Sequence, residues 1–348
     1  MSMKSIPKNK LSECLCLFND LNLYSDKPDR WIYPNLYTHK PTGDLVVVAP
    51  HNISPEKFEK AFYGLSTIFN RPISGIKDLG NHRWLLLENR LPDLVHYHSR
   101  PEHIPLGHFW LGTFDDGSPV ILAFDHSPVF LVAGASGSGK SELFKVLLKE
   151  IERTWGADTI TIAEGTKDGN DFRHQKCKRL ATDIESVLAV YQELESIYEE
   201  RKRLIRELDV DNWFEARSKG CDWKPHILLV DECPLFLSTP RKGDPDFEAK
   251  TEIIRIASHL AMRGRYVGLL QILGTQDPSS TGLPSDIMNQ VRLKVGYGMR
   301  TAEMARAYFG QAAPHAHDLQ QGKGIAMLGA EPKIFRGAFI RPQKKPAT

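Results

Sequence analysis

The chain has 348 residues, of which 41% are hydrophobic and 25% are charged, and its formal net charge is +2. Such a composition is ordinary for a globular protein, and the length allows one large domain together with a smaller one. A charge so close to zero excludes a protein that coats nucleic acid over its whole surface, so any contact with DNA should be local.

The cysteines and the N-terminal residues indicate the cellular compartment in which the protein is expected. The five cysteines include no C-x-x-C pair, which indicates a reducing environment and argues against a disulfide framework or a structural zinc site. The opening residues MSMKSIPKNKLSECLCLF lack the apolar stretch of a secretory signal, and no apolar run is long enough to span a bilayer. We therefore expect a cytoplasmic protein that would need a partner in order to work at a membrane.

The N-terminal part of the chain predicts two segments. Residues 1–40 are polar and contain scattered prolines, which predicts an irregular lead-in. Residues 41–103 predict a small α+β module. Residues 45–49 and 84–87 are typical of strands, and Ser54 and Pro55 are a typical N-cap and first residue of a helix.

Residues 104–340 predict a large α/β domain in which short apolar runs alternate with helical patterns. The runs lie at residues 130–133, 160–163, 227–230, 269–273 and 293–295. The longest helical pattern covers residues 182–208, with Thr182 and Glu185 as a capping box. This alternation predicts a mostly parallel sheet with helices on both faces. Residues 341–348 form a short basic tail.

The stretch GASGSGKS fits the pattern G-x-x-x-x-G-K-S between a predicted strand and an amphipathic helix. Its glycines allow backbone N–H groups to surround phosphates at a helix N-terminus. Lys140 should then reach the β and γ phosphates and the Ser141 hydroxyl should bind Mg²⁺, so ATP and Mg²⁺ are the expected cofactors. The alternative is a chance match in a turn. The expected nucleotide-binding residues are Gly134, Ala135, Ser136, Gly137, Ser138, Gly139, Lys140, Ser141 and Glu142.

Two further strand ends carry polar side chains. In HILLVDECP an apolar strand leads directly into Asp231 and Glu232. Because buried charge is costly, a strand that ends in two carboxylates favours a site at the sheet edge, with Asp231 binding Mg²⁺ and Glu232 polarising the attacking water. In LLQILGTQDPSS, Gln276 could sense the γ-phosphate or position that water. The alternatives are a solvated acidic pair and an ordinary turn cap.

Arginines and one polar loop are candidates for contacts with other molecules. Arg265 precedes the strand that leads to Gln276, and Arg292 opens the next strand. Either could complete a neighbouring subunit's ATP site, or could be an ordinary surface arginine. The loop of residues 240–246 follows the acidic strand and is a candidate for contact with DNA phosphates.

Taken together, the segments LVAGASGSGKSE, HILLVDECP, GRYVGLLQILGTQDPSS, GKGIAML and FRGAFI resemble the motor domain of the FtsK/SpoIIIE-type DNA translocases, within the FtsK–HerA superfamily. The resemblance extends from about residue 104 to residue 340. It implies a RecA-like P-loop core, a hexameric ring with ATP between subunits, and pore loops that move double-stranded DNA.

The resemblance also implies roles for single residues. Lys140 and Ser141 match the Walker A pair, and Asp231 and Glu232 match the Walker B pair. Gln276 matches the family's strand-end glutamine. Arg265 and Arg292 match arginines just before and just after that strand, without indicating which of them acts on a neighbour.

Some family features are altered. The family's "DPK" segment becomes Glu164-Gly-Thr-Lys here, and its "TQRP" motif becomes Thr275-Gln-Asp-Pro. Membrane spans in front and a winged-helix domain behind are not seen, so we expect a short, soluble FtsK-like protein of a plasmid, conjugative element or phage-related island. One alternative is a coupling-type ATPase that docks a relaxase–DNA complex onto a secretion channel. Another is a nucleotide-switched scaffold of a replication or packaging complex.

Overall fold

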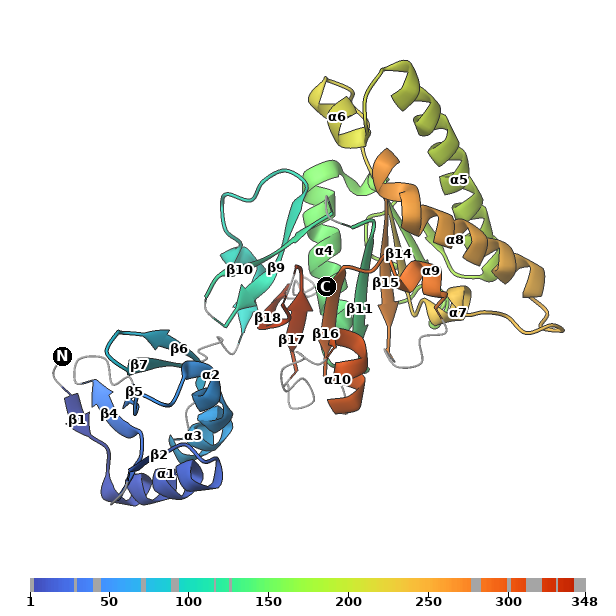
Figure 1. Ribbon diagram of the computed structural model, residues 1–348. Helices are drawn as coiled ribbons and strands as arrows, with labels where there is room; N and C mark the ends of the chain where they lie inside the picture. The colour runs from blue at the N-terminus through green and yellow to red at the C-terminus, as the bar shows by residue number, and fades with distance from the viewer. Residues whose placement is uncertain are drawn as a thin grey trace, which may run out of the picture. The chain divides into compact units, whose positions relative to one another are not determined.

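The computed structural model describes residues 3–27, 30–39, 45–69, 73–88, 94–115, 117–124, 127–276, 283–298, 302–310, 321–329 and 331–340. The chain divides into two compact units, Met1–Arg90 and Leu91–Thr348 (Figure 1). The predicted basic tail at residues 341–348 lies outside the described residues.

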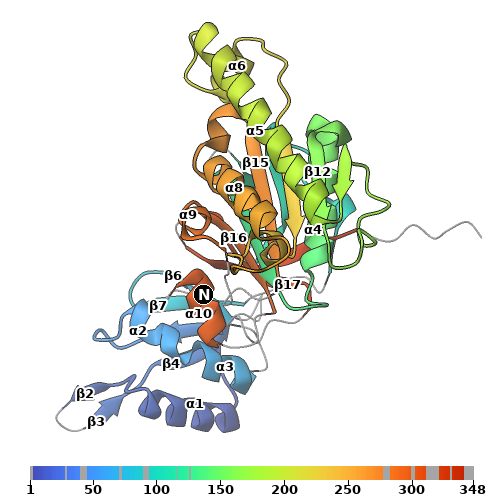
Figure 2. The same ribbon diagram turned by 90° about the vertical axis from the view of Figure 1, so that its right-hand side faces the viewer.

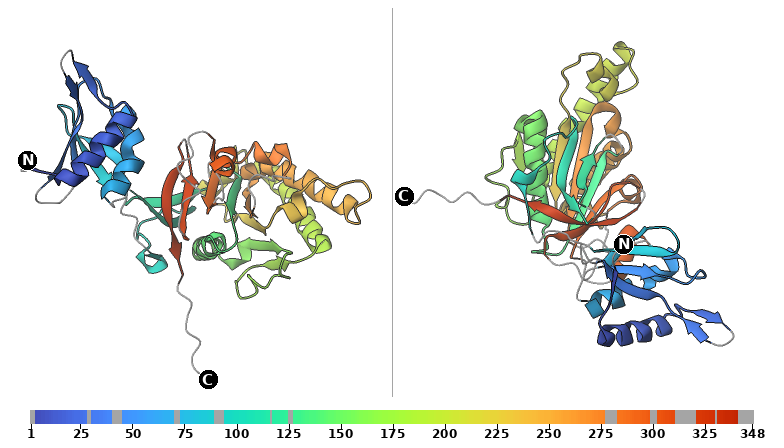
Figure 3. Two further views of the ribbon diagram at one scale, coloured as in Figure 1. Left: turned by 90° about the horizontal axis from the view of Figure 1, so that it is seen from below. Right: turned by 90° about the vertical axis from the view of Figure 1, so that its left-hand side faces the viewer.

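The smaller unit is built on an antiparallel sheet. Its strand order is β1 (Met3–Ser5), β4 (Asn35–His39), β5 (Leu45–Val48), β7 (Arg83–Glu88) and β6 (Ile73–Asp78). A hairpin and helices accompany the sheet: β2 (Ser25–Lys27), β3 (Arg30–Ile32), α1 (Lys8–Asp20), α2 (Pro55–Phe58), η1 (Glu59–Ala61) and α3 (Phe62–Phe69). Helices α1 and α3 lie side by side (Figure 3). As predicted, Ser54 caps α2 by accepting a hydrogen bond from the Lys57 N–H (3.3 Å).

The expectation of an irregular lead-in over residues 1–40 is wrong. Helix α1 buries Cys14 and Phe18, and β1 pairs with β4 so that Met3 lies opposite His39. The local signals are weak because the N-cap position of α1 is Pro7, which offers no side-chain hydrogen bond. The strand partner of β1 lies far along the chain, which a local pattern cannot reveal.

The larger unit contains one mixed sheet. Along it the order is β10-β9-β18-β17-β16-β11-β15-β14-β12-β13, with β8 beside β18. The strands are β8 (Val95–His96), β9 (His108–Phe114), β10 (Pro119–Ala123), β11 (Val129–Gly134), β12 (Ile160–Glu164), β13 (Arg179–Ala181), β14 (His226–Asp231), β15 (Leu269–Thr275), β16 (Leu293–Tyr297), β17 (Lys323–Met327) and β18 (Lys333–Phe339). From β16 to β13 each strand runs parallel to the next one along the sheet. From β10 to β16 each strand pairs antiparallel with the next one.

Helices cover both faces of the parallel strands (Figure 2). The helical segments are η2 (Tyr97–Ser99), α4 (Lys140–Trp155), η3 (Ala157–Thr159), α5 (Ile184–Glu207), α6 (Trp213–Ser218), α7 (Pro234–Leu237), α8 (Phe247–Val267), α9 (Ser285–Met288) and α10 (Ala302–Phe309). On β11, Leu131 belongs to the core beneath α5 and α8, whereas Phe130 and Val132 belong to the core beneath α4. Alternate side chains of a strand point to opposite faces. This arrangement confirms the predicted α/β fold with helices on both faces of a mostly parallel sheet.

The larger unit begins earlier than the expected boundary at residue 104. Strand β8 pairs with β18, with Val95 opposite Ala338. The Tyr97 hydroxyl donates to Glu150 Oε1 (2.6 Å) and Arg100 Nε donates to the same oxygen (2.7 Å). Glu150 is fully buried on α4. These contacts fasten the segment that follows residue 93 to the larger unit.

Helix α5 differs in detail from its prediction. Its capping box consists of Asp183 and Ser186, and the Ser186 N–H donates to Asp183 Oδ1 (2.8 Å). Near the other end, Arg201 is buried and donates from its two Nη atoms to the carbonyl oxygens of Val267 (2.8 Å) and Lys224 (2.6 Å). Arg201 is therefore a structural side chain that ties α5 to the end of α8.

Candidate nucleotide-binding site

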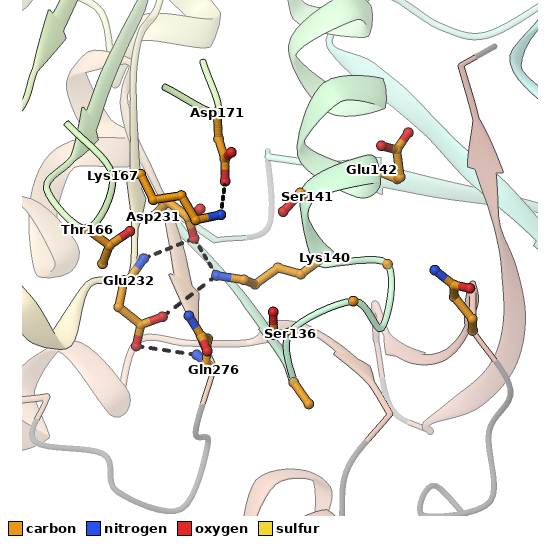
Figure 4. A pocket seen from close by; sticks show the side chains of 14 residues that line it. Ser136, Lys140, Ser141, Glu142, Thr166, Lys167, Asp171, Asp231, Glu232 and Gln276 are labelled. Carbon is orange, nitrogen blue, oxygen red and sulfur yellow. Dashed lines mark hydrogen bonds and ion pairs between the residues drawn. The ribbon is translucent and has the colours of Figure 1, made fainter. Parts of the chain in front are cut away.

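The predicted phosphate loop lies at the carboxyl edge of the parallel strands. It connects β11 to α4, and the ends of β14 and β15 lie beside it. A pocket of about 220 Å³ opens there. The lining residues are Ala135, Ser136, Gly137, Gly139, Lys140, Ser141, Glu142, Thr166, Lys167, Asp171, Asp231, Glu232, Gln276 and Gln321 (Figure 4). All of the predicted nucleotide-binding residues except Gly134 and Ser138 are in this set.

Glycine is required where the loop enters α4. Gly139 has φ +127°, a conformation that L side chains rarely adopt, and it directly precedes the first helical residue, Lys140. Gly134 and Ser138 support the loop from behind, because the Ser138 hydroxyl donates to the Ala135 carbonyl (2.6 Å) and a Cβ at Gly134 would lie 2.7 Å from Ser138 Oγ. The loop therefore presents its backbone at a helix N-terminus, where anions are favoured.

Lys140 lies among the acidic side chains. Its Nζ donates a hydrogen bond to Asp231 Oδ1 and lies 3.8 Å from Glu232 Oε2 (Figure 4). The side chains of Lys140 and Asp231 are about nine-tenths buried. Glu142 lines the same pocket but pairs with Lys145 (2.7 Å).

Glu232 has an unusual backbone and an unsatisfied carboxylate oxygen. Its φ is +50°, in the left-handed region that is uncommon outside glycine. Its N–H donates to Asp231 Oδ1 (2.9 Å), and its Oε1 accepts from the Gln276 N–H (3.4 Å). Its Oε2 is buried and accepts no hydrogen bond from the described residues. A left-handed backbone and a buried carboxylate oxygen that has an ion-pair partner at 3.8 Å but no hydrogen-bond donor among the described residues are typical of a functional site.

The end of β15 approaches this acidic pair closely. The Cys233 N–H donates to the Gly274 carbonyl (2.7 Å). A Cβ at Gly274 would lie 2.8 Å from Asp231 Oδ1 and 2.7 Å from Phe144 Cζ. Only glycine leaves room there for the Asp231 carboxylate, so the glycine of the G-T-Q segment shapes the site through its lack of a side chain.

The oxygen atoms in the pocket fit a magnesium ion. Asp231 and Ser141 line the same pocket, and Glu232 Oε2 is buried there without a hydrogen-bond donor among the described residues. Mg²⁺ prefers oxygen ligands and uses one or two carboxylates together with phosphates and water. Within the described ranges, no group of three or more His, Cys, Asp or Glu side chains forms a cation cage.

Four residues of the pocket were missed by the sequence analysis: Thr166, Lys167, Asp171 and Gln321. The first three belong to the segment after β12, which departs from the family's "DPK" pattern. Glu164, at the end of β12, is buried and organises this segment by accepting hydrogen bonds from backbone N–H groups that include those of Thr166 (2.7 Å) and Lys167 (2.9 Å). Lys167 Nζ in turn donates to Asp171 Oδ2 (2.6 Å), and this hydrogen bond raises the pKa of Lys167.

The two predicted arginines lie away from the pocket. Arg265 is in the last turn of α8, which leads into the start of β15, and Arg292 precedes β16; both are exposed. Both therefore lie at the amino edge of the parallel strands, whereas the pocket lies at the carboxyl edge. The seven residues of β15 separate these edges by roughly 20 Å. Neither arginine lines this chain's own pocket.

Within the part of the chain that the structure describes, every helix is too short or too polar to cross a membrane.

A glycine loop between strand and helix, with its lysine paired to an acidic dipeptide at the end of β14, two strands away from β11 in the sheet, is the arrangement of a P-loop fold. No protein-family model matches the chain. The chain is 30% identical to Protein Tra of Streptomyces lividans over 223 residues, 59% of this chain and 34% of Tra. It is 22% identical to the DNA translocase FtsK of Borreliella burgdorferi over 246 residues, 68% of this chain and 30% of that protein.

The fold matches that of the pCW3 conjugation coupling protein TcpA, solved as a monomer form with ATPγS. The TM-score is 0.68 at 19% identity, and the match covers 96% of each chain. By sequence, the chain spans about a third of the length of Tra and FtsK. These likenesses relate the chain to the FtsK/SpoIIIE-like ATPases, as its motifs predict.

Proposed function

We propose that the chain is an ATPase that assembles as a ring, a hexamer by family resemblance, and uses hydrolysis to move double-stranded DNA during transfer or maintenance of a plasmid, conjugative element or phage-related island. The observation that carries this proposal is the group formed by Lys140, Asp231 and Glu232 in a pocket bounded by the phosphate loop. Such a group suits phosphoryl transfer, in which catalysis is largely positioning and electrostatic stabilisation.

Each residue of the site has a task in this proposal. The loop N–H groups and Lys140 bind the phosphates, and Asp231 and Ser141 hold Mg²⁺. The metal, when bound, neutralises charge that develops on the phosphate oxygens. Glu232, whose Oε2 is buried without a hydrogen-bond donor among the described residues, accepts the proton of the attacking water. Gln276 lines the same pocket, and its side chain orients that water or senses the γ-phosphate in this proposal.

An arginine from a neighbouring subunit completes the site in this proposal. Arg265 and Arg292 lie at the opposite edge of the sheet from their own pocket, so either could act only on another copy. An isolated subunit should therefore hydrolyse ATP slowly. A ring also explains how a chain of net charge +2 could grip DNA, because a few cations of the loop at residues 240–246 are repeated around the channel.

A second candidate function is favoured by the TcpA match, which covers 96% of both chains. The protein could be a coupling ATPase that presents a relaxase–DNA complex to a membrane-anchored channel while itself remaining in the cytoplasm. Comparing the ATPase rate with duplex and with single-stranded DNA separates the two candidates. Stimulation by duplex supports the translocase, and stimulation by single strands alone supports the coupling protein. Unchanged turnover together with ATP-dependent partner binding would support a nucleotide-switched scaffold instead.

A further inference from the structure

The turn that precedes β17 forms one wall of the nucleotide pocket. In the sheet, β16 lies between β11 and β17, with Tyr297 opposite both Gly134 and Gly324. This register brings the turn at residues 321–322 to the edge of the sheet that carries the phosphate loop. Gln321 lines the pocket together with the loop residues.

Backbone hydrogen bonds hold this turn against the loop. The Gly322 N–H donates to the Ser138 carbonyl (3.0 Å), and the Gly337 N–H donates to the Gly322 carbonyl (3.0 Å). Gly322 has φ +76°, and a Cβ at Gly139 would lie 3.4 Å from Gly322 Cα. The turn is therefore in direct contact with the part of the loop that enters α4.

A buried arginine fastens the turn from the other side. Arg336 lies on β18 opposite Lys323 and is 6% exposed. Its Nη1 donates to the Gln321 carbonyl (2.6 Å), and a Cβ at Gly322 would lie 3.1 Å from that nitrogen. A guanidinium offers several donors in a fixed plane, which the flexible ammonium group of lysine cannot reproduce.

We propose that Arg336 is a positioning residue for nucleotide binding. It holds the turn carrying Gln321 against the phosphate loop, so that this wall of the pocket is formed before ATP arrives. A preformed wall lowers the entropic cost of binding. This inference rests on the proposed function, that the pocket binds ATP.

The first test compares two buried arginines that both donate to backbone carbonyls. Arg336→Lys should weaken binding of ATP with Mg²⁺ by about tenfold, the size expected when a charged hydrogen bond is lost. It should also shrink the rise in Tm caused by ATP and raise KM more than it lowers kcat. The control Arg201→Lys acts far from the turn, on the carbonyls of Val267 and Lys224. It should lower the Tm without ATP and leave the Kd for ATP unchanged.

A second pair of variants tests the turn without touching the arginine. Gly322→Ala places a Cβ against Arg336 at a left-handed backbone position, whereas Gly329→Ala, in the next turn, meets nothing within 4 Å. Of these two variants, only Gly322→Ala should weaken ATP binding. If Arg336→Lys does not fold, ATP binding by Gly322→Ala tests the proposal in its place. Binding equal to wild type in Gly322→Ala and in folded Arg336→Lys overturns this inference alone. Failure of the wild type to bind ATP overturns the proposed function as well.

Discussion

Lys140 Nζ donates a hydrogen bond to Asp231 Oδ1, which joins the first residue of α4 to the last residue of β14. Both side chains are about nine-tenths buried, so each compensates a charge that would be costly to bury alone. The pair joins the phosphate loop to the carboxylate that we propose as a metal ligand, and the first predictions follow from it.

Lys140→Ala should raise the Kd for ATP by at least about a hundredfold, or about 2.7 kcal/mol, because it removes the buried cation that we propose binds the phosphates. Lys145→Ala is the matched control. Lys145 lies on the same helix, is partly exposed and pairs with Glu142 (2.7 Å). Calorimetric titration of both variants is the measurement, and tight ATP binding by Lys140→Ala would contradict the assigned role.

Glu232→Gln should retain ATP and lose turnover. The amide keeps an acceptor oxygen for the Gln276 N–H but cannot accept a proton from water, so kcat should fall by about 10²–10³-fold. Glu199→Gln, an exposed position on α5, should leave kcat as it is. Brisk hydrolysis by Glu232→Gln would refute the assignment of the base.

Gly274→Ala should lower the free energy of unfolding by about 1–3 kcal/mol, because its Cβ would press on Asp231 and Phe144 at less than 3 Å. ATP binding should weaken as Asp231 is displaced. Urea unfolding measures the first effect, with Gly329→Ala as a control in open space. A Gly274→Ala protein as stable and as active as wild type would show that the close approach has no consequence.

The pH dependence of stability should include a contribution from His226. Burial, followed by the charges of Arg201 and Lys178, lowers the pKa of His226 from 6.5 to about 4, against the opposing effect of Glu193 and Asp158. The unfolded chain then binds a proton that the folded chain does not, so stability falls as the pH decreases from about 6.5 to about 4. The free energy of unfolding, measured at several pH values in this range, should change less with pH for His226→Gln than for the wild type. An identical pH dependence in the two proteins would exclude the contribution.

Mixing two kinds of variant subunit tests whether Arg265 or Arg292 acts in the ATP site of a neighbouring subunit. Lys140→Ala removes ATP binding, and Arg265→Ala or Arg292→Ala removes a group that we place in a neighbour's site. Mixing Lys140→Ala with the correct arginine variant should restore part of the ATPase activity, because some interfaces then combine an intact pocket with an intact arginine. Mixtures that stay as inactive as their components would argue against action between subunits.

The sequence predicted the parts of the site that are contiguous in the chain. The phosphate loop with Lys140 and the strand ending at Asp231 and Glu232 each carry their own local signal, a glycine pattern or an apolar run that meets charge. Thr166 was noticed only as part of the altered "DPK" segment and was given no role, and Gln321 gave no local signal. Both reach the pocket through sheet register and through hydrogen bonds to Glu164 or Arg336.

The fold was predictable to a similar degree. Buried parallel strands can be recognised in a sequence as apolar runs, so the strands that form the central parallel part of the sheet were located correctly. The first residues of the chain were not, because β1 depends on pairing with β4, and α1 has a proline at its N-cap. The start of the larger unit was also misplaced, since it depends on contacts of Tyr97 and Arg100 with Glu150 on α4.

Electron microscopy of the purified chain with duplex DNA and a slowly hydrolysed ATP analogue tests the central claim most directly. We predict closed rings with DNA in the central channel and nucleotide at each interface between subunits. Single chains that stay off the duplex under every nucleotide condition would contradict the account.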